Sequence, residues 1–309
     1  MGNFIVLNSP FVHSGNDVNK MFLYTSAALV VPAVYGIIFF GIEALILILA
    51  SLTSCMLSEM LFNFINGKKF KVDNFSFFVT GMILALTLPA KTPIWVVAVS
   101  AFFSIFVIKQ AFGGLGFNKF NPSNCGRCLA GVIAPALSSE LYAFTLNGET
   151  YESLAAGGAN NISDLLSGQA VGGVGTTCVL IIAVCAIFLT YTMVIDIKIP
   201  VMAVAAYFIT AMLKVGFEQA IINMLSGSFI FVCVFMLTDP NTSPDKFLGK
   251  ILYSVLFGVL SALCWINGSI GENTVFAVAL FVNILAPIFD RYLTIKPISQ
   301  GGIRNAHKK

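Results

Sequence analysis

Long apolar runs alternate with short polar stretches along most of the chain, and this pattern predicts helices that span a membrane. The runs have helix length and lack the residue-by-residue alternation of barrel strands. The third and fifth runs are short for a full crossing, which takes about 20 residues, so we expect them to be tilted or broken. The predicted segments, about ten in all, are 21–40, 43–65, 75–89, 94–112, 127–138, 178–195, 199–214, 219–237, 248–266 and 272–289.

Two polar elbows interrupt the apolar pattern and share a sequence. Residues 86–93 read LTLPAKTP and residues 237–244 read LTDPNTSP, so one leucine, one threonine and both prolines recur at an offset of 151. The flanking segments fall into the same register. We therefore predict two repeats of five segments, and because five is odd, the second repeat must be inverted in the membrane. Inverted repeats with interrupted helices are typical of transport proteins, whose sites lie near the repeat interface.

Composition excludes a soluble protein. The chain is 58% hydrophobic and 10% charged, with a mean hydropathy of +0.91, whereas soluble domains carry about 25% charged residues. The sequence therefore predicts an all-α, polytopic membrane protein. Most of the 17 lysine and arginine residues, Arg127 among them, fall on the side of the N-terminus, while the opposite side receives Lys91 and Lys214. By the positive-inside rule, both termini are expected in the cytoplasm.

These patterns divide the chain into five parts. We predict a cytoplasmic tail (1–20), a first membrane repeat (21–138), an outer loop (139–177), a second membrane repeat (178–290) and a second cytoplasmic tail (291–309). The outer loop carries acidic residues and no basic ones. A loop of this length in a compact protein is usually functional or disordered.

Few polar residues fall within or beside the apolar segments. Lys109 lies near the end of the fourth segment. It is either a functional charge within the membrane or a side chain that extends to the lipid headgroups. Asn121 precedes a proline and suits the cap of the next helix, although its amide also suits the edge of a flavin ring. Asp239 in the second elbow could cap a turn or contact a cation. Asp290 lies at the end of the last segment. It is either an interfacial anchor paired with the adjacent arginine or a binding site for a cation or proton.

No nucleotide-binding or hydrolytic motif is present. The sequence lacks a P-loop, a GxGxxG between a strand and a helix, and a Ser/His/Asp set. Both histidines, His13 and His307, lie in the terminal tails. Any redox chemistry would therefore need a bound cofactor.

Six blocks stand out along the chain: FVHSGNDVNKMF (11–22), FFVTGMILALTLP (77–89), VIKQAFGGLGFNKFNP (107–122), IDIKIPV (195–201), FMLTDPNTSP (235–244) and VNILAPIFDRYL (282–293). In the same order, they resemble the RnfD/NqrB family of membrane subunits, over about residues 9–293. The resemblance implies a subunit of an Rnf complex, which moves electrons between ferredoxin and NAD coupled to Na⁺ or H⁺ translocation across the prokaryotic cytoplasmic (inner) membrane. Its implied partners are RnfA, RnfB, RnfC, RnfE and RnfG, and the chain would not be an independent enzyme.

The resemblance also implies flavin cofactors that carry single electrons. Family members hold FMN through a phosphoester to a threonine in an outer loop, in a motif like SGAT. The counterpart here is NGET (147–150), which keeps Gly148 and Thr150. Asn147 and Glu149 depart from the motif, and Glu149 would place a carboxylate beside the phosphate.

A second, non-covalent flavin within the membrane, such as riboflavin, is implied as well. Our candidates for binding it are Asn121 and its neighbours Lys109, Gly114, Gly116 and Asn124. Two other functions stay open. One is a stand-alone transporter or channel, which an inverted repeat equally suits, and the other is a flavin-free scaffold subunit of the same complex.

Overall fold

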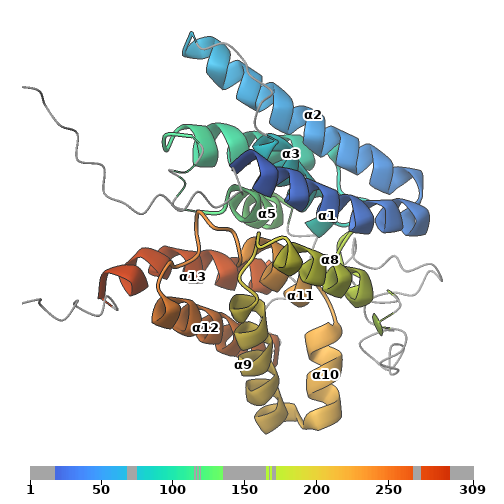
Figure 1. Cartoon of the computed structure of the whole chain (residues 1–309). Coiled ribbons are helices and arrows are strands. Elements are labelled where there is room, and N and C mark those ends of the chain that lie inside the picture. The colour runs from blue at the N-terminus through green and yellow to red at the C-terminus, as the bar shows by residue number, and fades with distance from the viewer. Residues whose placement is uncertain are drawn as a thin grey trace, which may run out of the picture.

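A computed structural model describes residues 18–67, 75–134 except 115, 117 and 119, 165–166, 168, 172–266 and 273–292. Every regular element within these ranges is a helix (Figure 1). Thr150 and most of the predicted outer loop lie outside the described residues, as do both ends of the chain. The expected covalent flavin site and the division of the chain into five parts therefore stay predictions.

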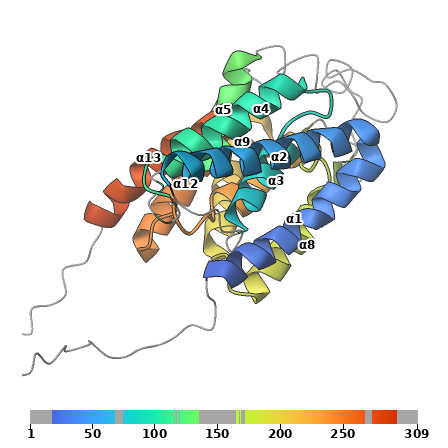
Figure 2. The same ribbon diagram turned by 90° about the horizontal axis from the view of Figure 1, so that it is seen from above.

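Each predicted segment contains a helix, and the two halves of the chain form two groups of helices. First-half helices occupy the upper part of Figure 1 and second-half helices the lower part, while α1 and α8 lie side by side in both views (Figure 2). The first half contains α1 (Val18–Phe40), α2 (Ile42–Ile65), α3 (Ser76–Thr87), α4 (Ile94–Phe102), the π-helix η1 (Phe103–Gln110) and α5 (Pro122–Ile133). The second half contains α8 (Val179–Tyr191), α9 (Lys198–Val215), α10 (Phe217–Leu225), α11 (Phe229–Phe231), the π-helix η4 (Val232–Met236), α12 (Phe247–Ile266) and α13 (Asn273–Tyr292).

Two segments differ from their predicted form. The fifth helix begins at Pro122, as the predicted Asn121 cap indicates, and not at residue 127, where the apolar run begins. The side chain of Asn121 accepts a hydrogen bond from the Asn124 N–H (3.2 Å), and proline suits the first turn. The eighth segment is broken: α10 and α11–η4 meet at an angle of 66°. Gly227 lies in the break with a φ of +72°, a conformation that costs glycine little.

The surface and the helix lengths confirm an all-α, polytopic membrane protein. Within the described ranges, α1, α2, α9, α12 and α13 are long and apolar enough to cross a membrane, and the bent α10–η4 pair counts as a sixth crossing if it is one span. The helices α3, α4–η1 and α8 are apolar but shorter. Ile38, Phe64 and Leu213 are 78%, 82% and 77% exposed. Such apolar surface is stable against lipid and unfavourable in water.

The order and packing of the helices follow the predicted repeat. The starts of α5 at Pro122 and α13 at Asn273 are separated by the same 151 positions as the elbows. The helices α3 and α11–η4 are both short and both end in an elbow. Helix α4 packs against α2 and α5, as α12 packs against α9 and α13. The equivalent helices α1 and α8 touch, as do α5 and α13, so the repeats meet along matched elements.

Small residues allow α9 and α12 to approach closely. A Cβ atom on Gly258 would lie 2.3 Å from the carbonyl oxygen of Ala203 and 2.9 Å from the Cβ atom of Ala206. Close backbone contact through small residues is a common way for membrane helices to associate. Because α12 follows the second elbow directly, this packing also fixes the position of that elbow.

Three consecutive carbonyls of the first elbow are bound from other parts of the chain. The N–H groups of Gly175 and Val174 donate to Leu86 (2.8 Å) and Leu88 (3.0 Å). The guanidinium Nε of Arg127 donates to Thr87 (3.0 Å), and the guanidinium lies 4.5 Å from the centre of the Phe276 ring. Arg127 is fully buried on α5. Its assignment to the charges on the cytoplasmic side is therefore wrong, because this arginine binds the end of α3.

Candidate functional site

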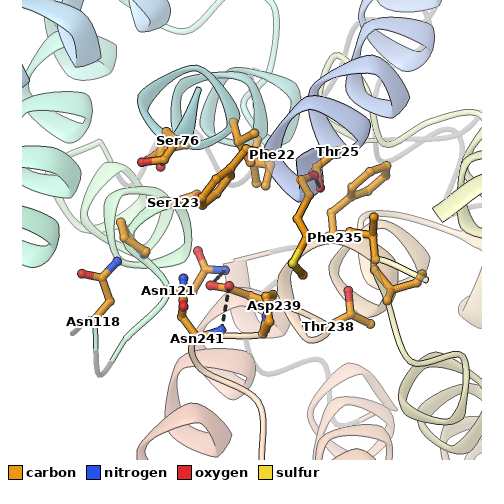
Figure 3. Close-up of a pocket in the computed structure, with 18 of the residues that line it drawn as sticks. Phe22, Thr25, Ser76, Asn118, Asn121, Ser123, Phe235, Thr238, Asp239 and Asn241 are labelled. Carbon is orange, nitrogen blue, oxygen red and sulfur yellow. Dashed lines mark hydrogen bonds between the residues drawn. The ribbon is translucent and has the colours of Figure 1, made fainter. Parts of the chain in front are cut away.

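A cavity of about 220 Å³ lies between the two repeats, beside the second elbow (Figure 3). Its walls come from α1, α3, η1, α5, α8 and η4. Pockets for drug-sized ligands measure roughly 300–1,000 Å³, so this one suits a ring system or part of a larger ligand. Apolar side chains line it on several sides, including Phe22, Val79, Ile83 and Phe235. A polar group of side chains, which we call the amide–carboxylate cluster, consists of Asn118, Asn121, Asp239 and Asn241.

Asn121 connects the two repeats within this cluster. Its amide nitrogen donates to the carboxylate of Asp239 (3.2 Å) and to the carbonyl oxygen of Met236 (3.4 Å). Its amide oxygen accepts from the N–H of Asn124 at the start of α5. The predicted helix cap is therefore confirmed, while flavin binding by the same side chain stays a prediction.

Asp239 organises the turn of the second elbow. Its carboxylate accepts hydrogen bonds from the N–H of Asn241 (3.1 Å) and the hydroxyl of Thr242 (3.4 Å). Its backbone carbonyl accepts from the N–H of Ser243 (2.9 Å). The capping role expected from the sequence is confirmed, and contact with a cation stays a prediction.

Lys109 lines the cavity and is paired with Glu59 of α2. Its Nζ lies 3.0 Å and 3.2 Å from the two carboxylate oxygens, and the amide of Gln110 donates to the same carboxylate at 3.1 Å. The Lys109 side chain is only 3% exposed and that of Glu59 is 15% exposed. The alternative in which Lys109 reaches the headgroups is therefore wrong. No local pattern predicts the pair, because its members are fifty residues apart.

The remaining flavin candidates lie outside the cavity wall. Gly114 and Gly116 have φ values of +89° and +86°, which glycine tolerates. With the amide of Asn118 turned so that its nitrogen faces these acceptors, it donates to the carbonyls of Gly114 (3.0 Å) and Lys109 (3.2 Å) and connects this loop to the end of η1. The sequence patterns did not indicate Asn118. Asn124 is fully buried and its amide nitrogen has no partner among the described residues.

Asp290 does not line the cavity, and its carboxylate holds the residues just before α12. Its carboxylate accepts from the N–H groups of Asp245 (3.0 Å and 3.2 Å) and Lys246 (3.1 Å). These bonds connect the end of α13 to the residues that follow the second elbow. A role in ion coupling is untested and stays a prediction.

A second, more open cavity of about 400 Å³ adjoins the first. Lys250 donates to Asp196 at 2.9 Å on its wall. Partial burial raises the pKa of Asp196, but hydrogen bonds from Lys250 and the Lys198 N–H outweigh it, so the pKa lies below its usual value. The carboxylate therefore stays charged at neutral pH, and its ion pair with Lys250 connects the α8–α9 loop to α12. The two cavities share Val194, Ile195, Thr238 and Pro240.

Together, these features define a class of protein: an all-α membrane protein in which two helical repeats enclose a cavity with a polar cluster at one repeat's elbow. No group of three or more histidine, cysteine or acidic side chains gathers into a metal site within the described ranges. The sequence matches the NQR2, RnfD, RnfE family over residues 5–299, and the chain belongs to this family.

Named relatives are subunits of redox complexes. The D subunit of the proton-translocating ferredoxin:NAD(+) oxidoreductase complex of Clostridium ljungdahlii is 26% identical, over 94% of this chain and 94% of its own. The D subunit of the Na(+)-translocating ferredoxin:NAD(+) oxidoreductase complex of Acetobacterium woodii is 28% identical, over 94% of this chain and 93% of its own. The B subunit of the Na(+)-translocating NADH-quinone reductase of Pseudomonas aeruginosa is 31% identical, over 75% of this chain and 63% of its own.

Proposed function

We propose that this chain is an electron-carrying membrane subunit of an ion-translocating ferredoxin:NAD oxidoreductase complex. Similarity to the D subunits of two such complexes, over nearly their whole lengths, supports this function. The complex would lie in a prokaryotic cytoplasmic membrane, with both termini of this chain in the cytoplasm. RnfA, RnfB, RnfC, RnfE and RnfG would be its partners, and ferredoxin and NAD would react elsewhere in the complex.

The cavity is the observation that carries the proposal, because its chemistry fits a flavin ring. An isoalloxazine has an apolar end and a polar edge that contains one N–H donor flanked by carbonyl acceptors. The cavity offers Phe22 and Phe235 for the apolar end. The Asp239 carboxylate would accept from the ring N–H, and the neighbouring amides would donate to the carbonyls. A bound flavin would supply one-electron transfer, while these residues orient the ring and exclude water.

Replacing Asn121 with alanine should lower the affinity for riboflavin about tenfold, because a bond between the repeats and a polar group of the cavity are lost together. The measurement is quenching of riboflavin fluorescence by the purified full chain in nanodiscs, with size-exclusion chromatography to verify folding. Asn223→Ala on α10 is the matched control, since its amide accepts from exposed Gln219 and is remote from the cavity. A wild-type chain that binds no riboflavin would refute a flavin site in this cavity, and a chain that carries no flavin at all would refute the proposed function.

A covalent FMN on Thr150 is a separate part of the proposal. The denatured chain, isolated from cells that assemble the whole complex, should keep a fluorescent flavin, and mass spectrometry should find FMN on the peptide that contains Thr150. Thr150→Ala should abolish the fluorescence, whereas Thr145→Ala in the same loop should leave it unchanged. If the wild-type peptide from an assembled complex is unmodified, the hypothesis of a covalent FMN is refuted. The chain would then carry only the non-covalent flavin, or no flavin.

Asp239 and Asp290 are our candidates for ion coupling. The place of Asp239 in the cavity wall, hydrogen-bonded to Asn121, supports the first, because a carboxylate that can bind a cation would then lie beside the proposed electron carrier. Asp290 is the weaker candidate, since its carboxylate already accepts backbone hydrogen bonds at the start of α12.

A further inference from the structure

A buried ion pair reaches the cavity through only one of its members. Lys109 lines the cavity, whereas its partner Glu59 belongs to α2 and does not. Both carboxylate oxygens of Glu59 lie within 3.2 Å of the ammonium. Glu59 can therefore act on a ligand in the cavity by neutralising the lysine, without touching the ligand.

The backbone around Lys109 forms a π-helix, in which two successive side chains contact Glu59. In η1 the N–H of Ala111 donates to the carbonyl of Phe106, five residues earlier, which is the wider turn of a π-helix. The successive residues Lys109 and Gln110 both donate to Glu59. Short π-helical turns are frequent at functional sites. A buried ion pair is also a poor source of stability, since apolar residues of similar volume usually serve as well. Stability alone therefore does not explain why this pair lies at the cavity wall.

We propose that Glu59 is a positioning residue that sets the electron affinity of a flavin in the cavity by neutralising Lys109. This inference rests on the proposed function. Reduction by two electrons and one proton leaves a negative charge on the ring, which a nearby cation stabilises. Charges interact more strongly in a protein interior than in water. With Glu59 in place, the pair contributes little net charge, and the Asp239 carboxylate is left as the dominant charge of the amide–carboxylate cluster.

The test is a reductive titration of the flavin-loaded full chain with dithionite, in which the midpoint potential is read from the flavin spectrum. Glu59→Gln leaves the ammonium unopposed and should favour the reduced ring about tenfold, a rise of about 30 mV for a two-electron couple. Lys109→Met leaves the carboxylate unopposed and should lower the potential by a similar amount. The double variant restores a neutral wall and should return the potential close to wild type.

The opposite signs and their cancellation separate electrostatics from a structural disturbance, which would not reverse between the two variants. Glu43→Gln is the matched control, because Glu43 is an exposed carboxylate in the first turn of the same helix. If Glu59→Gln does not fold, Lys109→Met and the double variant still test the inference as a pair. Flavin-loaded variants whose potentials stay within the change seen for Glu43→Gln would overturn this inference alone, whereas a wild-type chain that holds no flavin overturns the proposed function.

Discussion

Replacing Arg127 with alanine should destabilise the protein by about 3–5 kcal/mol, a large share of the stability of a typical folded protein. The side chain is fully buried, so its loss leaves a large void beneath the first elbow. The carbonyl of Thr87 also loses its donor, and Phe276 loses the guanidinium that covers it. The apparent midpoint of thermal unfolding in detergent should fall by on the order of 10 °C.

Two further substitutions identify the cause. Arg127→Lys keeps the positive charge but loses the planar group, which donates to Thr87 and covers Phe276 at the same time, so it should not restore stability. Arg291→Ala removes an exposed arginine at the end of α13 and should change the midpoint little. A stability of Arg127→Lys close to wild type would show that charge alone matters at this elbow, and would contradict a role for the planar guanidinium.

The features that the sequence predicts well depend on neighbouring residues. The apolar runs each contain a helix, and the two elbows indicate the order of the repeats. Asn121 and the following proline predict where a helix begins, since capping is decided within one turn. The eighth segment is mostly apolar and is predicted as one span, but the short polar run Ser226–Gly227–Ser228 marks the point where it breaks.

The contacts that build the cavity could not be predicted in this way. Glu59 and Lys109 lie on different helices, and Asn121 and Asp239 belong to different repeats, so nothing in either local sequence specifies the partner. Arg127 resembles a surface charge for the same reason: a buried arginine and an exposed one look alike until the carbonyl that it binds is known. Which residues pair with one another is decided by how the repeats pack, and this packing is seen only in the structure.

Asp239→Asn should leave assembly intact and lower the ion-coupled turnover of the complex about tenfold, a barrier increase of roughly 1.4 kcal/mol. The turn should survive, because an amide oxygen can still accept the N–H of Asn241 and the backbone carbonyl still accepts from Ser243. The other carboxylate oxygen becomes an amide nitrogen, which cannot accept from Asn121 or Thr242, so the charge and these two hydrogen bonds are removed together. If the carboxylate contacts the transported cation, the cation concentration that gives half-maximal turnover should also rise.

The measurement is NAD reduction by ferredoxin in proteoliposomes that contain the whole complex, titrated with Na⁺ at several pH values and normalised to flavin content. Asp196→Asn is the matched control, since it neutralises a carboxylate that binds Lys250 on the wall of the neighbouring cavity, away from the amide–carboxylate cluster. Loss of turnover in Asp239→Asn alone, with a shifted cation dependence, places the acid in ion coupling. Unchanged turnover would limit Asp239 to forming the turn, because an asparagine at this position can still accept from the Asn241 N–H and keeps the backbone bond to Ser243.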